Sequence, residues 1–303
     1  MSDPELRWPA RALARQLQPL LPGLEVEIVR STASTNSALL ERARVRPDVA
    51  AEGGAALIHR SVESAAFGRR ASDWHPCLMI AEQQTAGRGR QGREWSSEAG
   101  ASLTFSLGLP LDTNEWSGLS LAIGVALCEA LDPIGGDTRP QGRPHLALKW
   151  PNDLWLMAPD GSGRKLGGIL IESVTAGAQR LAIIGVGLNV LRFTVVHAGT
   201  GFAALQELDP TTTPPGVLTQ IALPLVLALK QFEREGFAAF AERFAARDLL
   251  RGHAVRTTQP DAPEGIARGV SAQGALLLET ADGLKPVFSG EVSVRLAEPA
   301  AGQ

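Results

Sequence analysis

The pattern of apolar and polar positions predicts alternating helices and strands over most of the chain. Helices are expected where apolar residues recur at helical spacing, over 9–21, 36–45, 117–131 and 217–249. Strands are expected where they alternate or form short runs, over 24–30, 77–84, 102–109, 145–150, 167–174 and 181–190. Ser34 and Thr35 can cap the second helix, and Pro224 should start or kink the last one. The 46–76 stretch mixes Gly, Ala, Pro and Ser, which indicates a long loop or insertion.

The pattern changes after Leu250. Short strand-like runs follow one another there with turn residues between them, which predicts a small barrel of about 45 residues. We therefore expect a domain boundary near 249–251. The predicted parts are a large domain over 1–249, a small one over 250–297 and a tail over 298–303.

Composition excludes several classes of protein. The chain has 303 residues, 44% hydrophobic and 20% charged, which is ordinary for a globular protein. Its net charge of -3 disfavours nucleic-acid binding over the whole surface, because phosphate neutralisation needs a basic face. Cys77 and Cys128 are the two cysteines, and no long apolar run opens the chain. We expect free thiols, no membrane span and a cytoplasmic location.

Lysine is scarce in this sequence. Of the 29 basic residues, four are lysine and the other 25 (29 minus 4) are arginine. In a chain that uses arginine nearly everywhere, lysine is expected where a compact charge on a flexible stem is needed. Lys149 and Lys165 both fall in segments that carry other chemical signals, although chance and biased base composition could also produce this.

An arginine- and glycine-rich segment over 84–93 (QTAGRGRQGR) follows a predicted buried strand. Glycines let backbone N–H groups approach an anion, and arginine forks suit phosphate and carboxylate oxygens. Trp95 follows and could stack on a purine or cover the site. The alternatives for such a run are a solvated flexible loop or an RNA contact.

Two further segments place a lysine beside other polar groups. In KWPND, Pro151 ends a strand, and Asp153 could pair with Lys149 or hold Mg²⁺. In RKLGGILIE, Lys165 opens a strand whose glycines allow close approach, or it is simply a surface lysine.

The sequence lacks several familiar nucleotide-binding and catalytic motifs. GVGLNV over 185–190 lacks the third glycine of a dinucleotide fingerprint. The chain has no Walker A sequence, metal-ligand histidine spacing or nucleophile elbow.

These segments occur in an order that resembles the bacterial biotin–protein ligases. The matching runs are STN at 34–36, AEQQTAGRGRQGREW at 81–95, KWPNDLW at 149–155, RKLGGILIES at 164–173 and GVGLNV at 185–190. The run over 269–295 also resembles the small SH3-like domain of that family. The resemblance covers roughly residues 25–297 and implies an α+β fold, in which a mixed β-sheet with flanking helices, like that of class II aminoacyl-tRNA synthetases, precedes the SH3-like barrel.

The resemblance also implies roles for particular residues. Biotin would be surrounded by Ser34, Thr35, Asn36 and Gln84. The loop that closes over biotin and its adenylate would include Gly87, Arg88, Gly89 and Arg90, with Trp95 beside the adenine. Lys165 would reach the biotin carboxylate and the α-phosphate. Asn189 and the backbone of 185–188, including Gly187, would line the nucleotide side, and Asn152 and Asp153 would orient Mg²⁺ or phosphate. Lys149 and Gly168 would also take part in cofactor binding. Glu291 and Arg295 would help to close the nucleotide or carrier side.

The implied reaction uses ATP, biotin and Mg²⁺. The biotin carboxylate attacks the α-phosphorus, pyrophosphate leaves, and a carrier lysine then attacks the acyl carbon, with Asp153 as a possible base. The implied partner is the biotin carboxyl carrier protein of acetyl-CoA carboxylase, and the ligase would be a monomer or a homodimer. Many relatives begin with a DNA-binding domain, whereas 33 residues precede Ser34 here, so we expect no specific DNA binding. A lipoate ligase or octanoyl transferase, a nucleic-acid-binding regulator and an inactive biotin sensor are the alternatives.

Overall fold

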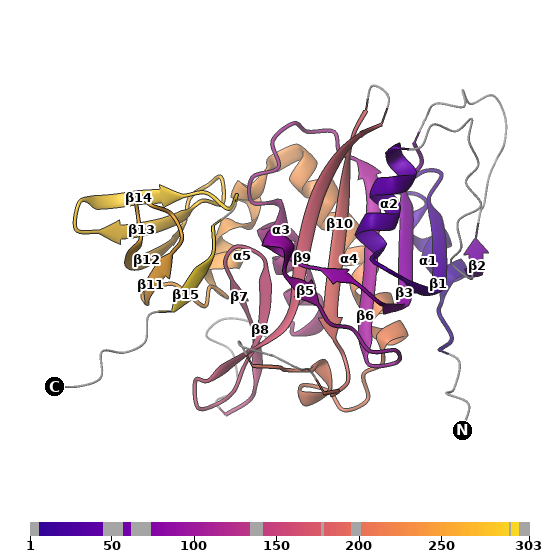
Figure 1. Ribbon diagram of the computed structural model, residues 1–303, viewed down its shortest axis with the longest axis horizontal. Helices are drawn as coiled ribbons and strands as arrows, with labels where there is room; N and C mark the ends of the chain where they lie inside the picture. The colour runs from indigo at the N-terminus through magenta and orange to yellow at the C-terminus, as the bar shows by residue number, and fades with distance from the viewer. Residues whose placement is uncertain are drawn as a thin grey trace. The chain divides into compact units, whose positions relative to one another are not determined.

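The structure, a computed structural model, describes residues 6–44, 57–61, 74–133, 142–176, 179–194, 201–290 and 292–296 (Figure 1). Its chain divides into two compact units, each built from separate stretches of sequence. Unit 1 comprises residues 1–112 and 164–227, and unit 2 comprises residues 113–163 and 228–303. The grouping differs from a division near 249–251, so that boundary stays a prediction.

Unit 1 is built on a mixed β-sheet, which confirms the predicted fold class. Its strands run in the order β2-β1-β3-β6-β10-β9. They span Glu25–Thr32 (β1), Leu57–Ser61 (β2), Cys77–Gln84 (β3), Ser102–Pro110 (β6), Gly163–Ala176 (β9) and Gln179–Asn189 (β10). β1 and β3 are parallel, and the other neighbouring pairs are antiparallel. The side chains of β6 are buried on both faces, as a central strand requires.

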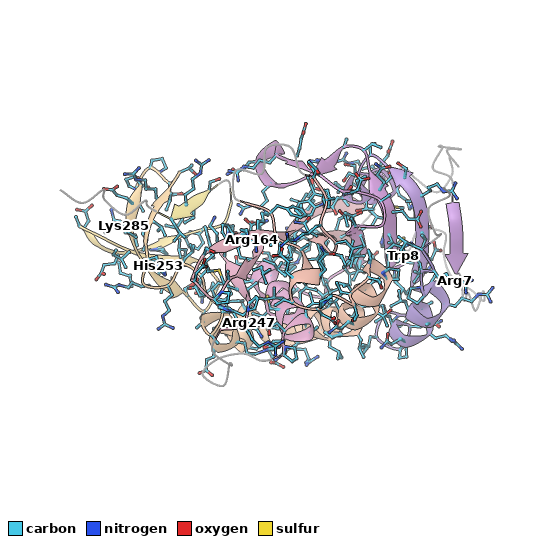
Figure 2. The ribbon with its side chains drawn as sticks, turned by 90° about the horizontal axis from the view of Figure 1, so that it is seen from below. Arg7, Trp8, Arg164, Arg247, His253 and Lys285 are labelled. Carbon is cyan, nitrogen blue, oxygen red and sulfur yellow. The ribbon has the colours of Figure 1, made fainter. Side chains whose placement is uncertain are left out.

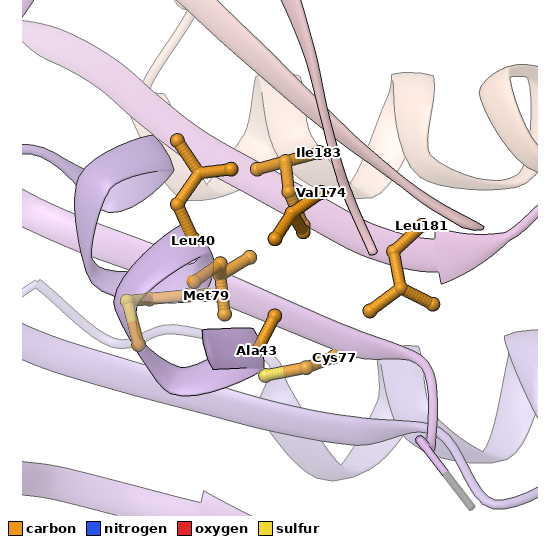
Figure 3. Close-up of a cluster of buried hydrophobic side chains, with 8 residues drawn as sticks. Leu40, Ala43, Cys77, Met79, Val174, Leu181 and Ile183 are labelled. Carbon is orange, nitrogen blue, oxygen red and sulfur yellow. The ribbon is translucent and has the colours of Figure 1, made fainter. Parts of the chain in front are cut away.

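Helix α2 (Thr35–Arg44) packs its apolar side on this sheet. Leu40 and Ala43 contact a buried cluster with Met79 of β3 and Ile183 of β10 (Figure 3). Removing this apolar surface from water stabilises the fold, by roughly 1.5–3 kcal/mol for each fully buried large side chain. The packing fixes the first turn of α2 against the sheet, and that turn carries the STN sequence.

Two further helices have residues in unit 1. Helix α1 (Ala10–Leu17) buries Leu13 and Leu17 on one side, as its sequence pattern predicts. Helix α4 (Pro214–Glu235) is long and apolar enough to cross a membrane by length and composition. Half of its apolar stretch is buried, including Leu218 and Ile221, and one such helix is weak evidence for a membrane span. Location in the cytoplasm stays a prediction.

Unit 2 contains a helix, a hairpin and a second sheet. Helix α3 spans Leu119–Leu131, and the hairpin strands are β7 (His145–Lys149) and β8 (Asp153–Met157). The antiparallel sheet has the order β14-β13-β12-β11-β15. Its strands span Ala254–Thr257 (β11), Glu264–Val270 (β12), Leu276–Thr280 (β13), Gly283–Val287 (β14) and Val294–Leu296 (β15). Short antiparallel strands were expected here. No pairing closes this sheet into a barrel within the described residues, so closure stays a prediction.

Polar contacts between distant segments hold unit 2 together. The buried Trp150 indole donates to the Gly274 carbonyl at 3.0 Å. Arg247, labelled in Figure 2, donates to the carbonyls of Asp132 and Leu146 at 2.5 and 3.2 Å. The Trp150 bond therefore joins the turn of the β7–β8 hairpin to the C-terminal sheet, and the Arg247 bonds join the segment before β11 to the end of α3 and to β7.

Several elements differ from the sequence-based expectation. Strand β8 follows the Pro151 turn, where we expected no strand. Strand β2 lies within the 46–76 stretch that we expected to be a loop, because its backbone pairs with β1. The remainder of that stretch up to 73 lies outside the described residues. Pro224 lies inside α4 without ending it, and Gly236, at φ 63°, separates α4 from the next helical segment.

Candidate active site

The first turn of α2 joins the end of β3 in unit 1. The Ser37 N–H lies 3.4 Å from Ser34 Oγ, a weak helix cap of the kind the sequence predicts. The Thr35 N–H donates to Gln84 Oε1 at 2.7 Å. Three residues from the segments 34–36 and 81–95, far apart in sequence, therefore lie side by side.

Asn36 is buried in the middle of a set of polar side chains. Its Nδ2 donates to Glu172 Oε2 at 2.9 Å and lies 3.3 Å from the Leu170 carbonyl. Its Oδ1 lies 2.6 Å from Ser106 Oγ. A Cβ on Gly185 would come within 2.3 Å of the same Oδ1, so only glycine leaves room for this amide. We call Thr35, Asn36, Gln84, Ser106 and Glu172 the polar cluster.

The Arg/Gly segment forms a small hairpin beside the polar cluster. Strands β4 (Gly87–Arg88) and β5 (Glu94–Trp95) pair across a short 3₁₀ turn, η1 (Arg90–Gly92). The Gly89 N–H donates to the Arg93 carbonyl at 2.7 Å. Arg88 pairs with Glu172 at 3.2 Å and donates to Ser37 Oγ at 3.3 Å. One predicted loop arginine is therefore held over the polar cluster.

Trp95 lies against β10. A Cβ on Gly187 would come within 2.5 Å of the Trp95 ring, so the glycine provides the surface on which the indole rests. Gly187 pairs with Gly168 on β9. The Trp95 indole nitrogen is buried, and no hydrogen-bond partner for it is found among the described residues. The structure thus brings together Trp95, Gly187 and Gly168, for which the resemblance implies cofactor binding, a role that stays a prediction.

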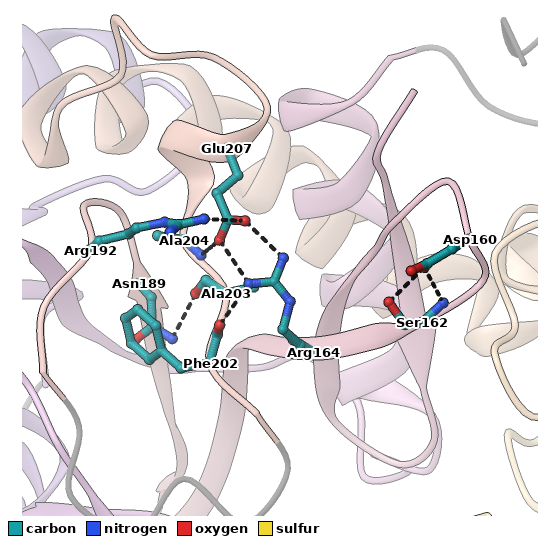
Figure 4. Close-up of polar contacts among 9 residues, drawn as sticks. All are labelled: Asp160, Ser162, Arg164, Asn189, Arg192, Phe202, Ala203, Ala204 and Glu207. Carbon is teal, nitrogen blue, oxygen red and sulfur yellow. Dashed lines mark hydrogen bonds and ion pairs between the residues drawn. The ribbon is translucent and has the colours of Figure 1, made fainter. Parts of the chain in front are cut away.

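Lys165 and Asn189 meet a segment that the sequence did not single out. The Ala203 N–H donates to the Lys165 carbonyl at 3.0 Å, and Asn189 Nδ2 donates to the Ala203 carbonyl at 3.1 Å (Figure 4). Residues 202–204 therefore connect β9 to the end of β10.

Glu207, in the short 3₁₀ helix η3 (Leu205–Glu207), fixes that segment. Its carboxylate accepts bonds from Arg164 at 2.7 Å, Arg192 at 2.9 Å and the Ala204 N–H at 3.0 Å (Figure 4). Arg164 also donates to the Phe202 carbonyl at 3.0 Å. Burial alone would raise the pKa of Glu207, but the Arg164, Ala204 and Arg192 bonds outweigh it and lower the pKa.

We expect Glu207→Gln to lower the free energy of unfolding by about 1–2 kcal/mol at neutral pH, because charge-assisted bonds are lost from a side chain that is 13% exposed. The Arg192 contact should add little, since Arg192 is 63% exposed. The folded-state pKa of Glu207 is depressed, so its contribution exists above the unfolded pKa and disappears as pH falls through the folded pKa.

Urea denaturation at several pH values measures this effect. The difference between wild type and Glu207→Gln should shrink as the solution is acidified. Glu279→Gln, which removes an exposed pair with Arg268, is the matched control and should change stability by less than about 0.5 kcal/mol. An equal effect of the two substitutions would contradict the role of Glu207.

The other predicted site residues belong to unit 2. Lys149 pairs with Asp153 in the β7–β8 register, and its Nζ donates to the Val294 carbonyl at 2.8 Å. The same ammonium lies 5.4 Å from the Trp155 ring centroid. Arg295 directly follows Val294, and Asn152 lies in the turn of the hairpin. The Lys149 ammonium therefore also links the hairpin to β15, a structural contact that its motif did not reveal.

Two expectations about charged groups remain predictions. No group of three or more His, Cys, Asp or Glu that could hold a metal ion is found in the described part of the chain. Mg²⁺ commonly binds through one or two carboxylates and substrate phosphates, so Asp153 stays a candidate. Glu291 lies outside the described residues.

Sequence reasoning missed Glu172, Ser106 and Glu207. Ser106 had a signal, because hydroxyl residues alternate at 102, 104 and 106 in an otherwise apolar strand, and all three are buried. Glu172 lies inside a quoted motif but was not recognised, since its partners come from α2 and the β4–β5 hairpin. Glu207 had no local signal.

Two parts of the chain match protein-family profiles, and the chain is similar to a named ligase. Residues 66–189 match the profile of the biotin/lipoate A/B protein ligase family. Residues 254–295 match the biotin protein ligase C-terminal domain. The chain is 30% identical over 284 residues to the biotin–[acetyl-CoA-carboxylase] ligase of Mycobacterium tuberculosis, covering 88% of each protein.

Another relative is named as both a ligase and a repressor. The chain is 37% identical over 225 residues to the bifunctional ligase/repressor of Escherichia coli, covering 72% of this chain. It spans about two thirds (66%) of the length of that relative. Among solved structures, it is similar to the biotin protein ligase from Aquifex aeolicus in complex with biotin and ATP. That match has a TM-score of 0.67 and 25% identity, and covers 90% of this chain and 99% of the other.

Proposed function

The chain belongs to the biotin/lipoate A/B protein ligase family, and from this premise we propose that it is an ATP-dependent biotin–protein ligase. It forms biotinyl-5'-AMP from biotin and ATP, releases pyrophosphate and transfers biotin to a carrier lysine. The observation that carries the proposal is that the polar cluster, the β4–β5 hairpin with Arg88 and the Trp95–Gly187 contact lie together in unit 1. The same chain also matches the biotin protein ligase C-terminal domain.

The first step joins two anions, so positive charge is needed where they meet. A biotin carboxylate oxygen attacks the α-phosphorus, and the bond to the pyrophosphate oxygen breaks. Arg88 and Lys165 would balance the charge that develops on the phosphoryl oxygens. Arg88 is 47% exposed, so part of its guanidinium can reach a ligand while Glu172 holds it.

The second step consumes the mixed anhydride. The amine of a carrier lysine attacks the acyl carbon, an amide bond forms and AMP leaves. Water would also hydrolyse the anhydride, so the β4–β5 hairpin with Trp95 would protect it. Asp153 could take the proton from the attacking amine, and its role and that of Mg²⁺ remain proposals.

The carrier is proposed to be the biotin carboxyl carrier protein of acetyl-CoA carboxylase, on the strength of the named relatives. Absence of specific DNA binding and the oligomeric state stay predictions. The lipoate-transferring alternative shares the family profile, but the C-terminal match and the named relatives favour biotin.

A transfer assay tests the proposal. Purified protein is incubated with ATP, Mg²⁺ and a carrier domain, with either biotin or lipoate as the acid, and the carrier mass is measured. We expect a mass increase with biotin only. Transfer of lipoate instead, or no transfer of either acid, would contradict the proposed function.

A further inference from the structure

We propose that Glu172 is a positioning residue that fixes the direction of the hydrogen bonds through the polar cluster. The inference rests on the proposed function, because the polar cluster is taken to bind biotin. It adds a residue that has no assigned role in that function.

Glu172 presents acceptors only. An ionised carboxylate has no hydrogen to donate, so each group bound to it must be a donor. Its Oε2 accepts from Asn36 Nδ2 at 2.9 Å, and its Oε1 pairs with Arg88 at 3.2 Å. The NH₂ end of the Asn36 amide must therefore face Glu172, and Oδ1 must face the opposite side.

That orientation determines what the next hydroxyl does. Asn36 Oδ1 can only accept, so Ser106 donates its single hydrogen to it across 2.6 Å. Ser106 Oγ also lies 2.6 Å from Thr35 Oγ1. Since the Ser106 hydrogen is already used, the Thr35 hydroxyl must donate in this second bond.

Gln84 lies beside Thr35 and is oriented by a backbone donor, not by Glu172. Its Oε1 accepts from the Thr35 backbone N–H at 2.7 Å. Thr35 Oγ1 lies 3.2 Å from that oxygen, a longer contact than the one to Ser106, so its hydrogen stays with Ser106. The Thr35 hydroxyl then offers only lone pairs, which suit an N–H donor of a ligand and reject a ligand carbonyl.

Because the polar cluster is buried, reversing or breaking its hydrogen bonds costs free energy. The residues Thr35 and Asn36 are each 3% exposed and Ser106 is fully buried, so water can hardly replace a broken bond. The Glu172 side chain is 22% exposed, and the Arg88 guanidinium balances its charge. A glutamine at 172 could present either its NH₂ or its oxygen to Asn36. The donors and acceptors of the hydrogen bonds among Asn36, Ser106 and Thr35 would then no longer be fixed.

A reciprocal exchange of acid and amide tests the proposal. The four proteins are wild type, Glu172→Gln, Asn36→Asp and the double variant, and biotin affinity is measured calorimetrically without ATP. We expect Glu172→Gln to weaken affinity about tenfold. Asn36→Asp should weaken it roughly a hundredfold, because two carboxylates then face each other. The double variant should bind more tightly than Asn36→Asp, since the amide at 172 donates to the acid at 36 and Ser106 still donates to that acid.

Controls separate this effect from general destabilisation. Glu172→Asp keeps two acceptors and should stay closer to wild type than Glu172→Gln does, and Glu279→Gln should bind biotin as wild type does. The change should fall on biotin affinity and leave the KM for ATP nearly unaltered.

The possible outcomes are distinguishable. A wild type that transfers biotin, with a Glu172→Gln variant of equal biotin affinity, would overturn the Glu172 proposal alone. So would a double variant that binds no better than Asn36→Asp. A wild type that binds biotin but transfers none contradicts the proposed function instead, and the affinity cycle still decides the role of Glu172.

Discussion

Lys165→Ala should slow biotinyl-adenylate formation about 10²–10³-fold, the usual cost of removing one group that stabilises charge in a transition state. Lys165 is the single lysine in the sequence of unit 1, and the Ala203 bond fixes its backbone at the start of β9. Pyrophosphate release in the absence of carrier measures this step directly. The effect should appear in kcat more than in the biotin KM, because the charge develops during the reaction.

Two companion variants make the Lys165 test specific. Lys230→Ala removes a lysine that pairs with Glu233 on α4 at 2.8 Å, and it should alter the rate less than about twofold. Lys165→Arg keeps the charge but replaces a compact ammonium by a planar fork, so it should recover only part of the rate. Equal losses in Lys165→Ala and Lys230→Ala would remove the reason for assigning Lys165 to the reaction.

Gly185→Ala should weaken biotin binding about 10–100-fold while leaving the protein folded. The added Cβ would lie 2.3 Å from Asn36 Oδ1, and the amide cannot move without breaking its bonds to Glu172 and Ser106. Overpacking of this kind costs about 1–3 kcal/mol, which gives the expected range. Calorimetric titration with biotin measures the change.

The matched control for Gly185 is another glycine in unit 1. Gly216 lies in the first turn of α4, is exposed, and a Cβ there would meet only Thr213 Oγ1 at 3.0 Å. Gly216→Ala should keep wild-type affinity, because its added Cβ meets Thr213 and not the amide of Asn36. Unchanged biotin affinity in Gly185→Ala would show that Asn36 does not belong to the biotin site.

Much of the secondary structure could be predicted from the sequence, because buried elements impose a period. The limits of β3 were predicted at 77–84 and confirmed, since the run begins with five apolar residues and glycines follow it at 87 and 89. β8 was missed because the Pro-Asn-Asp turn before it masked a five-residue run, DLWLM. The break in the last helical region was missed because a single glycine, Gly236, has to adopt a positive φ there.

Only the site residues that lie in the quoted motifs could be predicted from the sequence. The resemblance assigned residues 34–36, Gln84 and Arg88 to the site, and the structure brings Thr35, Asn36, Gln84 and Arg88 together, although their roles stay predictions. Glu172 and Glu207 each have a charged or polar partner more than 40 residues away in sequence, Asn36 and Arg164 respectively, and a local sequence pattern does not show such a contact. Lys149 was singled out by its motif, but its contact was not, because the bond from its ammonium to the Val294 carbonyl depends on how the C-terminal sheet packs.

The most direct test of the central claim is to isolate the intermediate. The protein is incubated with biotin, Mg²⁺ and ATP labelled at the α-phosphate, without carrier, and the bound material is separated and identified by mass spectrometry. We expect biotinyl-5'-AMP and pyrophosphate in equal amounts, and addition of a carrier domain should convert the bound adenylate to biotinylated carrier and AMP. Absence of the adenylate, or an adenylate that the carrier cannot discharge, would contradict the account.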